Sequence, residues 1–313
     1  MSAHGGSKAV LAALGANLGI AVIKFIAFLL TGSSSMLAES VHSLADSGNQ
    51  ALLLLGGHRS RREATAEHPF GYGRDRYVYG FLVALVLFTV GGLFAVYEGI
   101  HKIADPHHLD SPQIAIGVLL VAIVLESLSF RTAIRESRGP KGNSSWPEFI
   151  RRAKVPELPV VLLEDFAALV GLTLALFGVG LSVLLDEPVW DGVGTVAIGV
   201  LLIAVAVILI IETKSLLLGE AASPAAVSRI EAALVGDSAS GISGVIHHRT
   251  MHLGPDEVLV AAKVSMSPGS SLAEVANAID AAEARVRAAE PTARVIYLEP
   301  DVYRPELATG GTG

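Results

Sequence analysis

Long apolar stretches with almost no charge alternate with short polar segments along the chain as far as Ile211. The hydrocarbon layer of a membrane is about 30 Å thick and an α-helix rises about 1.5 Å per residue, so a crossing helix needs about 20 mostly apolar residues. The pattern predicts six membrane-spanning helices, at Lys8–Leu30, Met36–Gly57, Tyr77–Ile100, Ile114–Phe130, Leu158–Leu185 and Trp190–Ile211. Only the second and fifth predicted spans carry polar groups near their middles.

The pattern changes after Ile211, where charges become frequent and the apolar runs shorten. Helix caps, period-two alternation and a Gly254-Pro255 turn predict a helix, two strands, a second helix and a last strand. These elements are expected at Pro224–Leu234, Ile242–His252, Glu257–Met266, from the capping box Ser271-x-x-Glu274 onward, and at Ala293–Leu298. We therefore expect a six-helix transmembrane domain at 1–218, a small α+β domain at 219–307 and a flexible tail at 308–313.

Basic residues predict how the helices are oriented. The segments after predicted spans two and four hold twelve Lys and Arg residues, whereas the opposite segments hold only Lys102. Because Lys and Arg concentrate on the cytoplasmic side of a membrane, the twelve should face the cytoplasm. Six spans then place both termini in the cytoplasm, and we expect a multi-pass protein of the cell membrane.

Composition narrows the chemistry. With 51% hydrophobic residues, only 17% charged residues and a net charge of −7, the chain has no basic face for nucleic acid. It contains no cysteine, which excludes disulfides, thiolate catalysis and sulfur metal ligands. A metal site would have to use His, Asp and Glu.

The second predicted span carries Glu39, His42 and Asp46, spaced so that they share one face of a helix. A carboxylate near the middle of a membrane costs several kcal/mol (about 3 on insertion scales) unless it is paired, hydrated or bound to a metal. Metal binding is therefore favoured for His42 and Asp46. For Glu39, an ion pair with Lys24 of the first span is an equally open alternative.

The fifth predicted span places the adjacent acids Glu164 and Asp165 at the depth of His42 and Asp46. Neighbouring residues on a helix differ by about 100°, so both acids can bind one ion only if the backbone relaxes or the metal lies off the helix axis. Otherwise one of the two acids supports the site without touching the metal. Nitrogen and oxygen ligands of this kind suit Zn²⁺, with Fe²⁺, Co²⁺ and Mn²⁺ left open. Since each ligand must lack a proton to bind, metal and protons would compete for the site.

Several motifs resemble those of the cation diffusion facilitator family of metal exporters. They are TGSSSMLAESVHSLADSGNQ at 31–50, HPFGYGR at 68–74, the Asp-bearing fifth span, and a last strand followed by Glu299-Pro300. Within the family the chain most resembles the zinc transporter nine branch, in which LLED replaces a His-x-x-x-Asp motif in span five.

The resemblance implies that His42, Asp46 and Asp165 are metal ligands. The fourth ligand of the family would stand at Val161, which cannot bind a metal, so Glu164, Glu39 or water must replace it. The resemblance also implies a homodimer in the lipid bilayer that exchanges divalent metal for protons by alternating access, with a ferredoxin-like cytoplasmic domain. No resident cofactor is expected.

The leading hypothesis is therefore proton-coupled export of a divalent metal, Zn²⁺ foremost, from the cytoplasm. The alternative is a non-transporting membrane metal sensor or scaffold that signals through the cytoplasmic domain. An enzyme is not expected, because no HExxH-type motif is present. His68 is expected in a rigid turn, and His247, His248 and His252 as solvated surface residues, although a second metal site at either place stays open.

Overall fold

A computed structural model describes residues 3–109, 111–237 and 240–303, with side chains described from Asn17 onward. The chain divides into two compact units, which are described separately below. The first comprises residues 1–59 and 76–214, and the second comprises residues 60–75 and 215–313. The predicted tail at 308–313 lies outside the described residues.

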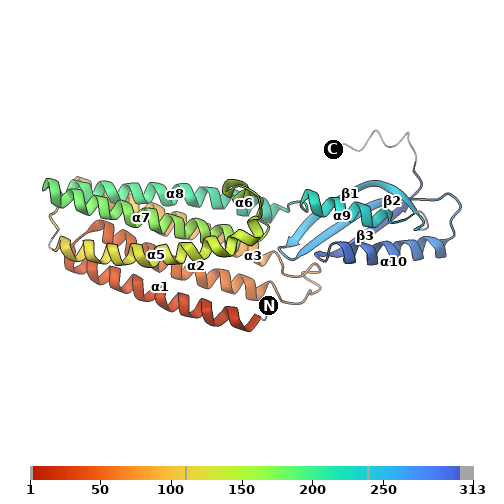
Figure 1. The fold of residues 1–313 in the computed structure, drawn as a ribbon, viewed down its shortest axis with the longest axis horizontal. Coiled ribbons are helices and arrows are strands. Elements are labelled where there is room, and N and C mark those ends of the chain that lie inside the picture. The colour runs from red at the N-terminus through yellow and green to blue at the C-terminus, as the bar shows by residue number, and fades with distance from the viewer. Residues whose placement is uncertain (1–2, 110, 238–239, 304–313) are drawn as a thin grey trace. The chain divides into compact units, whose positions relative to one another are not determined.

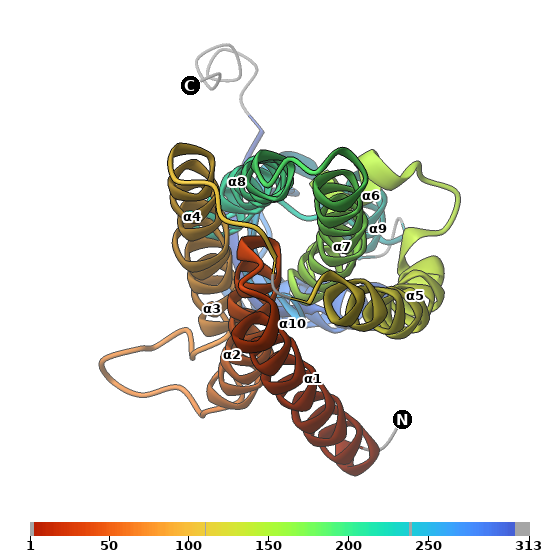
Figure 2. The ribbon, with the colours of Figure 1, turned by 90° about the vertical axis from the view of Figure 1, so that its left-hand side faces the viewer.

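The first unit is made of long helices, and each predicted span falls within one helix or one continuous helical run (Figure 1). In chain order these are α1 (Ala3–Thr31), α2 (Ser34–Arg59), α3 (Asp75–Val86), the π-helix η1 (Leu87–Leu93), α4 (Phe94–Ala104), α5 (Pro112–Lys141), α6 (Trp146–Arg152), α7 (Glu157–Leu185) and α8 (Val189–Leu218). Helix α1 packs along α2, and α5 packs along α7, as the end-on view of Figure 2 shows.

Four helical runs among the described residues are long and apolar enough to cross a membrane. They are Asp75–Ala104, Pro112–Lys141, Glu157–Leu185 and Val189–Leu218. The described apolar part of α1, Asn17–Thr31, is shorter than a span. Helix α2 has the length of a span but carries the polar residues of the predicted site. The number of six spans therefore stays a prediction.

Glycines let α8 approach its neighbours closely. A Cβ atom on Gly99 would lie 2.7 Å from the backbone nitrogen of Val196, and one on Gly199 would lie 2.7 Å from that of Val96. On its other side, α8 meets α7 where the Cα atom of Gly178 lies 3.2 Å from a Cβ atom built on Gly194. Small residues of this kind permit close helix packing in membranes.

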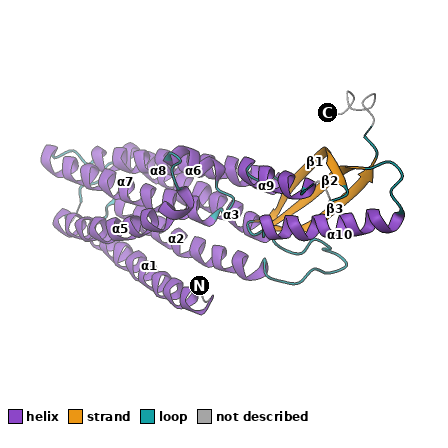
Figure 3. Cartoon of the chain, turned by 45° about the vertical axis from the view of Figure 1, so that its right-hand side comes forward, coloured by secondary structure: helices purple, strands orange, loops and turns teal. Residues whose placement is uncertain are grey.

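The second unit contains α9 (Pro224–Val235), β1 (Ile242–Gly254), β2 (Glu257–Met266), α10 (Leu272–Ala289) and β3 (Ala293–Asp301), in the predicted order (Figure 3). The sheet order is β1-β2-β3, with β1 antiparallel and β3 parallel to β2. Both helices pack their apolar faces on Val258, Val260 and Val264 of β2. The predicted capping box of Ser271 and Glu274 is present.

A buried carboxylate ties α9 to the segment between α10 and β3. Glu290 accepts hydrogen bonds from Arg229 of α9 and from the Thr292 hydroxyl. Burial alone would raise the pKa of Glu290, but these bonds outweigh burial and hold the pKa below its usual value.

Candidate functional site

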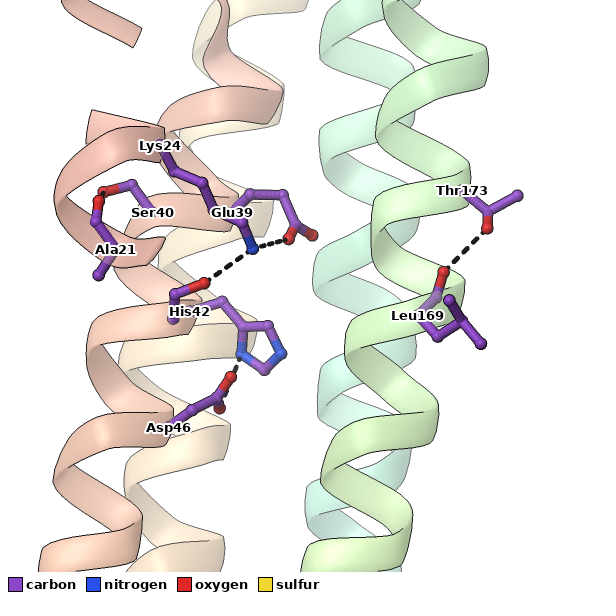
Figure 4. Close-up of polar contacts among 9 residues, drawn as sticks. Ala21, Lys24, Glu39, Ser40, His42, Asp46, Leu169 and Thr173 are labelled. Atoms are coloured by element: carbon purple, nitrogen blue, oxygen red, sulfur yellow. Dashed lines mark hydrogen bonds and ion pairs between the residues drawn. The ribbon is translucent and has the colours of Figure 1, made fainter. Parts of the chain in front are cut away.

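The described part of α2 presents a column of buried polar side chains toward the interior of the helical unit. Glu39, His42, Asp46 and Asn49 follow one another at spacings of three and four residues, and each is at most 8% exposed. The spacing places them on one helix face, as predicted for the first three. Figure 4 shows His42 directly above Asp46 on this face.

His42 is buried, and its ring makes no hydrogen bond with the described residues. Neither ring nitrogen has a hydrogen-bond partner among the described residues, and the Nδ1 atom lies 3.5 Å from Asp46 Oδ1 without hydrogen-bond geometry. The ring faces the π-helix η1, where a Cβ atom on Gly91 would lie 3.8 Å from Nδ1. π-Helical turns often accompany functional sites. The ring therefore has two nitrogens for which the described protein supplies no hydrogen bond.

Glu39 is held by a lysine, which was one of the two sequence-based alternatives. The Lys24 ammonium donates to Glu39 Oε2 at 3.1 Å and to the Ser43 hydroxyl at 2.8 Å, with Lys24 and Glu39 almost fully buried (Figure 4). Glu39 Oε1 has no hydrogen-bond partner among the described residues and points toward Gly171 of α7. The Lys24–Glu39 pair is thus confirmed, and Glu39 keeps one oxygen without a hydrogen bond.

The two adjacent acids of α7 point in different directions. Glu164 turns toward α2, where its carboxyl interacts with that of Asp46 and its Oε1 atom accepts a hydrogen bond of 2.7 Å from Asn49. Asp165 turns toward α5 and accepts a hydrogen bond of 2.9 Å from Ser129. Val161 lies in an apolar cluster with Phe149.

No three His, Asp or Glu side chains in the described part of the chain converge closely enough to hold one metal ion. His42 lies near Asp46, and Asp46 interacts with Glu164, whereas Asp165 lies with α5 and Glu39 lies with Lys24. The predicted ligand set therefore does not meet in this conformation, and its assignment stays a prediction.

Sequence reasoning missed another buried carboxylate, Asp191, at the start of α8. Its side chain is fully buried and accepts hydrogen bonds from the hydroxyls of Ser33, Ser34 and Ser35 and from the backbone N–H of Ser34. The signal was the serine run inside the TGSSS motif. Serine hydroxyls at the start of a helix favour hydrogen bonds, so this run indicated a polar partner. This contact joins the beginnings of α2 and α8.

Comparison with known proteins identifies the family of this chain. A family model described as the cation efflux transmembrane domain matches residues 10–218. The chain belongs to the cation efflux family. The family is a transporter family and not a class of enzymes, and the predicted resemblance to cation diffusion facilitators is confirmed.

Two relatives in the cation efflux family are named proton-coupled zinc antiporter SLC30A9, mitochondrial. The protein of Xenopus laevis is 34% identical over 76% of this chain and 43% of its own length, and that of Homo sapiens is 32% identical over 74% and 41%. Metal tolerance protein C4 of Arabidopsis thaliana is 30% identical over 74% of this chain and 51% of its own length. The chain thus matches about half or less of the length of these relatives.

The other histidines predicted from the sequence lie in the second unit. His68 lies in a turn, where its ring packs edge-on against Tyr72 at 4.7 Å, as favoured. His247 and His248 are partly exposed, and His248 pairs with Glu231 of α9. The surface assignment is wrong for His252, which is only 6% exposed and lies 3.2 Å from the Gly254 carbonyl oxygen.

Proposed function

We propose that this chain exports a divalent metal cation, Zn²⁺ foremost, from the cytoplasm in exchange for protons. The observation that carries the proposal is a group of buried polar atoms on α2 without hydrogen-bond partners among the described residues, which includes both His42 nitrogens and Asp46 Oδ1. Buried polar groups are normally hydrogen-bonded, and leaving them unpaired costs about 1–3 kcal/mol each. A cation bound by one His42 nitrogen and by Asp46 Oδ1 would supply an interaction that both atoms lack.

We propose that protons and the metal compete for Asp46 and Glu164, whose carboxyl groups interact. A divalent cation needs both groups ionised, whereas a proton can neutralise a carboxylate when the metal is absent. Entry of the metal would therefore release protons, and departure of the metal would allow their return.

We propose His42, Asp46 and Asp165 as direct ligands, with Glu164 completing the site in place of Val161. Because Asp165 bonds to Ser129 here, it would have to leave Ser129 to reach the metal, and we propose that α7 rotates relative to α5 when it does so. Such a rotation is one way in which alternating access would couple the site to the two sides of the membrane. We further propose six spans, both termini on the cytoplasmic side, and a homodimer.

Zinc flux into vesicles under a proton gradient tests the function. Mutation of a residue that only hydrogen-bonds to a metal ligand lowers metal affinity or activity by about 10- to 100-fold. Loss of a direct ligand should cost more, so Asp46→Asn and His42→Ala should each lower flux by ~100-fold or more. His107→Ala is the matched control, since this histidine is exposed and lies in a connecting segment. Full flux in Asp46→Asn would refute the proposal. Zinc binding without flux in the unaltered protein would favour the metal sensor instead.

A further inference from the structure

Helix α5 is the least buried of the four long apolar helical runs. Its exposed apolar residues Val121, Val124 and Leu128 are each more than half exposed. Spacings of three and four residues place them on one face. The same face continues with exposed Arg131, Arg135 and Arg138 at the same spacings. The helix therefore changes from an apolar to a basic surface along one line, at the end of its apolar segment.

This change is what a helix crossing into the headgroup layer requires. Acyl chains contact the apolar residues, and lipid phosphates lie just beyond them, within reach of long basic side chains. The segment 131–154 holds seven basic and two acidic residues, a net charge of +5, in a chain whose total is −7. This segment is therefore strongly positive, although the chain as a whole is negative.

A pocket lies at the end of this basic line, where α5 turns into α6. Its volume is about 180 Å³, and its lining includes Lys141, Arg152 and Lys154. The Lys141 ammonium lies 5.2 Å from the ring centroid of Trp146, and Trp146 and Phe149 anchor α6 to α5 and α7. Tryptophan favours the membrane interface because its ring is apolar and its N–H is polar.

We infer that this pocket binds the phosphate of an anionic phospholipid headgroup, with Lys141, Arg152 and Lys154 as its cationic partners. Its volume is below that of pockets for drug-sized ligands, and a lipid needs to place only its headgroup there. The acyl chains would lie along Val121, Val124 and Leu128. The inference requires α5 to cross the membrane and does not depend on the metal site.

Tryptophan quenching by brominated lipids tests the site. The chain has two tryptophans, so Trp190→Phe leaves Trp146 as the only indole. The full-length variant is placed in phosphatidylcholine vesicles that contain brominated phosphatidylglycerol or, at equal mole fraction, brominated phosphatidylcholine. Trp146 should be quenched more by the anionic lipid. Equal quenching by the two lipids would overturn the inference.

Variants that remove positive charges test whether the pocket causes the preference of Trp146 for the anionic lipid. In Lys141→Gln/Arg152→Gln/Lys154→Gln, the preference for the anionic lipid should fall by about five-fold per side chain, the contribution of one basic residue near an anionic surface. Arg59→Gln/Arg61→Gln/Arg62→Gln removes the same charge from another segment and should keep the preference. Lys141→Arg/Lys154→Arg should also keep it, which separates loss of charge from misfolding. An unchanged preference in the first variant would contradict the site.

Inorganic phosphate distinguishes a lipid headgroup from a soluble phosphate compound as the occupant of the pocket. Added to vesicles of phosphatidylcholine alone, it should leave Trp146 emission unchanged. A saturable change with inorganic phosphate, together with equal quenching by the two brominated lipids, would assign the pocket to a soluble phosphate compound and refute the lipid headgroup.

Discussion

Two kinds of buried carboxylate occur in the helical unit, and they differ in how well they are satisfied. Asp191 accepts several hydrogen bonds from the serine run, so its burial is explained by the fold alone. Asp46 Oδ1 and Glu39 Oε1 have no hydrogen-bond partner among the described residues. Burial by itself therefore does not identify a binding site, whereas a buried acid with an unused acceptor beside an unused imidazole points to a missing cation.

The Lys24–Glu39 pair makes a prediction about stability. Removing one partner of a buried ion pair leaves an uncompensated charge and costs about 3–5 kcal/mol, whereas replacing both partners by apolar residues is often close to neutral. We expect Lys24→Met to lower the thermal midpoint in detergent more than Lys24→Met/Glu39→Met does. A double variant less stable than Lys24→Met would contradict this account of the pair.

The Lys24→Met variant also tests whether the Lys24–Glu39 pair affects metal binding. In Lys24→Met, Glu39 loses its ammonium partner, and added Zn²⁺ should raise the midpoint more than it does in the unaltered protein, because a carboxylate is freed beside His42. Repeating the titration in Lys24→Met/Glu39→Gln, where that gain should disappear, is the control.

Local spacing explains which site residues could be predicted. The positions of Glu39, His42 and Asp46 depend only on the helix period, so the sequence was sufficient for their common face. The different neighbours of Glu164 and Asp165 depend on the rotation of α7 against α2 and α5, which no local pattern encodes. Asp191 was missed because its partners lie more than 150 residues away in the chain.

At the scale of helices, contacts through glycine determine how closely α8 packs. Gly92 and Gly99 are seven residues apart in the run from η1 to α4, and Gly192 and Gly199 are seven apart in α8. Each would bring a Cβ atom within 3.0 Å of an atom of the facing helix. The apolar pattern predicted these helices but not which faces meet, and the π-helix η1 left no signal in it.

This packing predicts opposite effects for two Gly→Ala changes. At Gly99 the new methyl group would lie 2.7 Å from a backbone nitrogen of α8, and overpacking of this kind costs about 1–3 kcal/mol. At Gly117 of α5 nothing lies within 4 Å, and alanine should stabilise the helix by about 0.5–1 kcal/mol. Thermal unfolding in one detergent measures both. Equal shifts of the two variants would show that close packing at Gly99 does not limit stability.

At the scale of the whole molecule, the order of elements was predictable because apolar length and turn residues are local properties. Helix α5 extends beyond its predicted end at Phe130 to Lys141, since a helix with a basic face in water remains helical after its apolar segment ends. The number of spans stays a prediction, because the column of polar side chains on α2 lowers the hydropathy of this helix.

The absence of cysteine allows the six-span arrangement to be tested directly. Single cysteines at Glu63, Asn143 and Leu272 should react with a membrane-impermeant maleimide from one side of the membrane, because the basic segments and the second unit would share that side. Cysteines at Gly32 and Glu187 should react only from the other side. All five residues are exposed in the structure. Labelling of Gly32→Cys from the same side as Glu63→Cys would mean that α2 does not cross, and the column of polar side chains on α2 would then lie outside any transmembrane path.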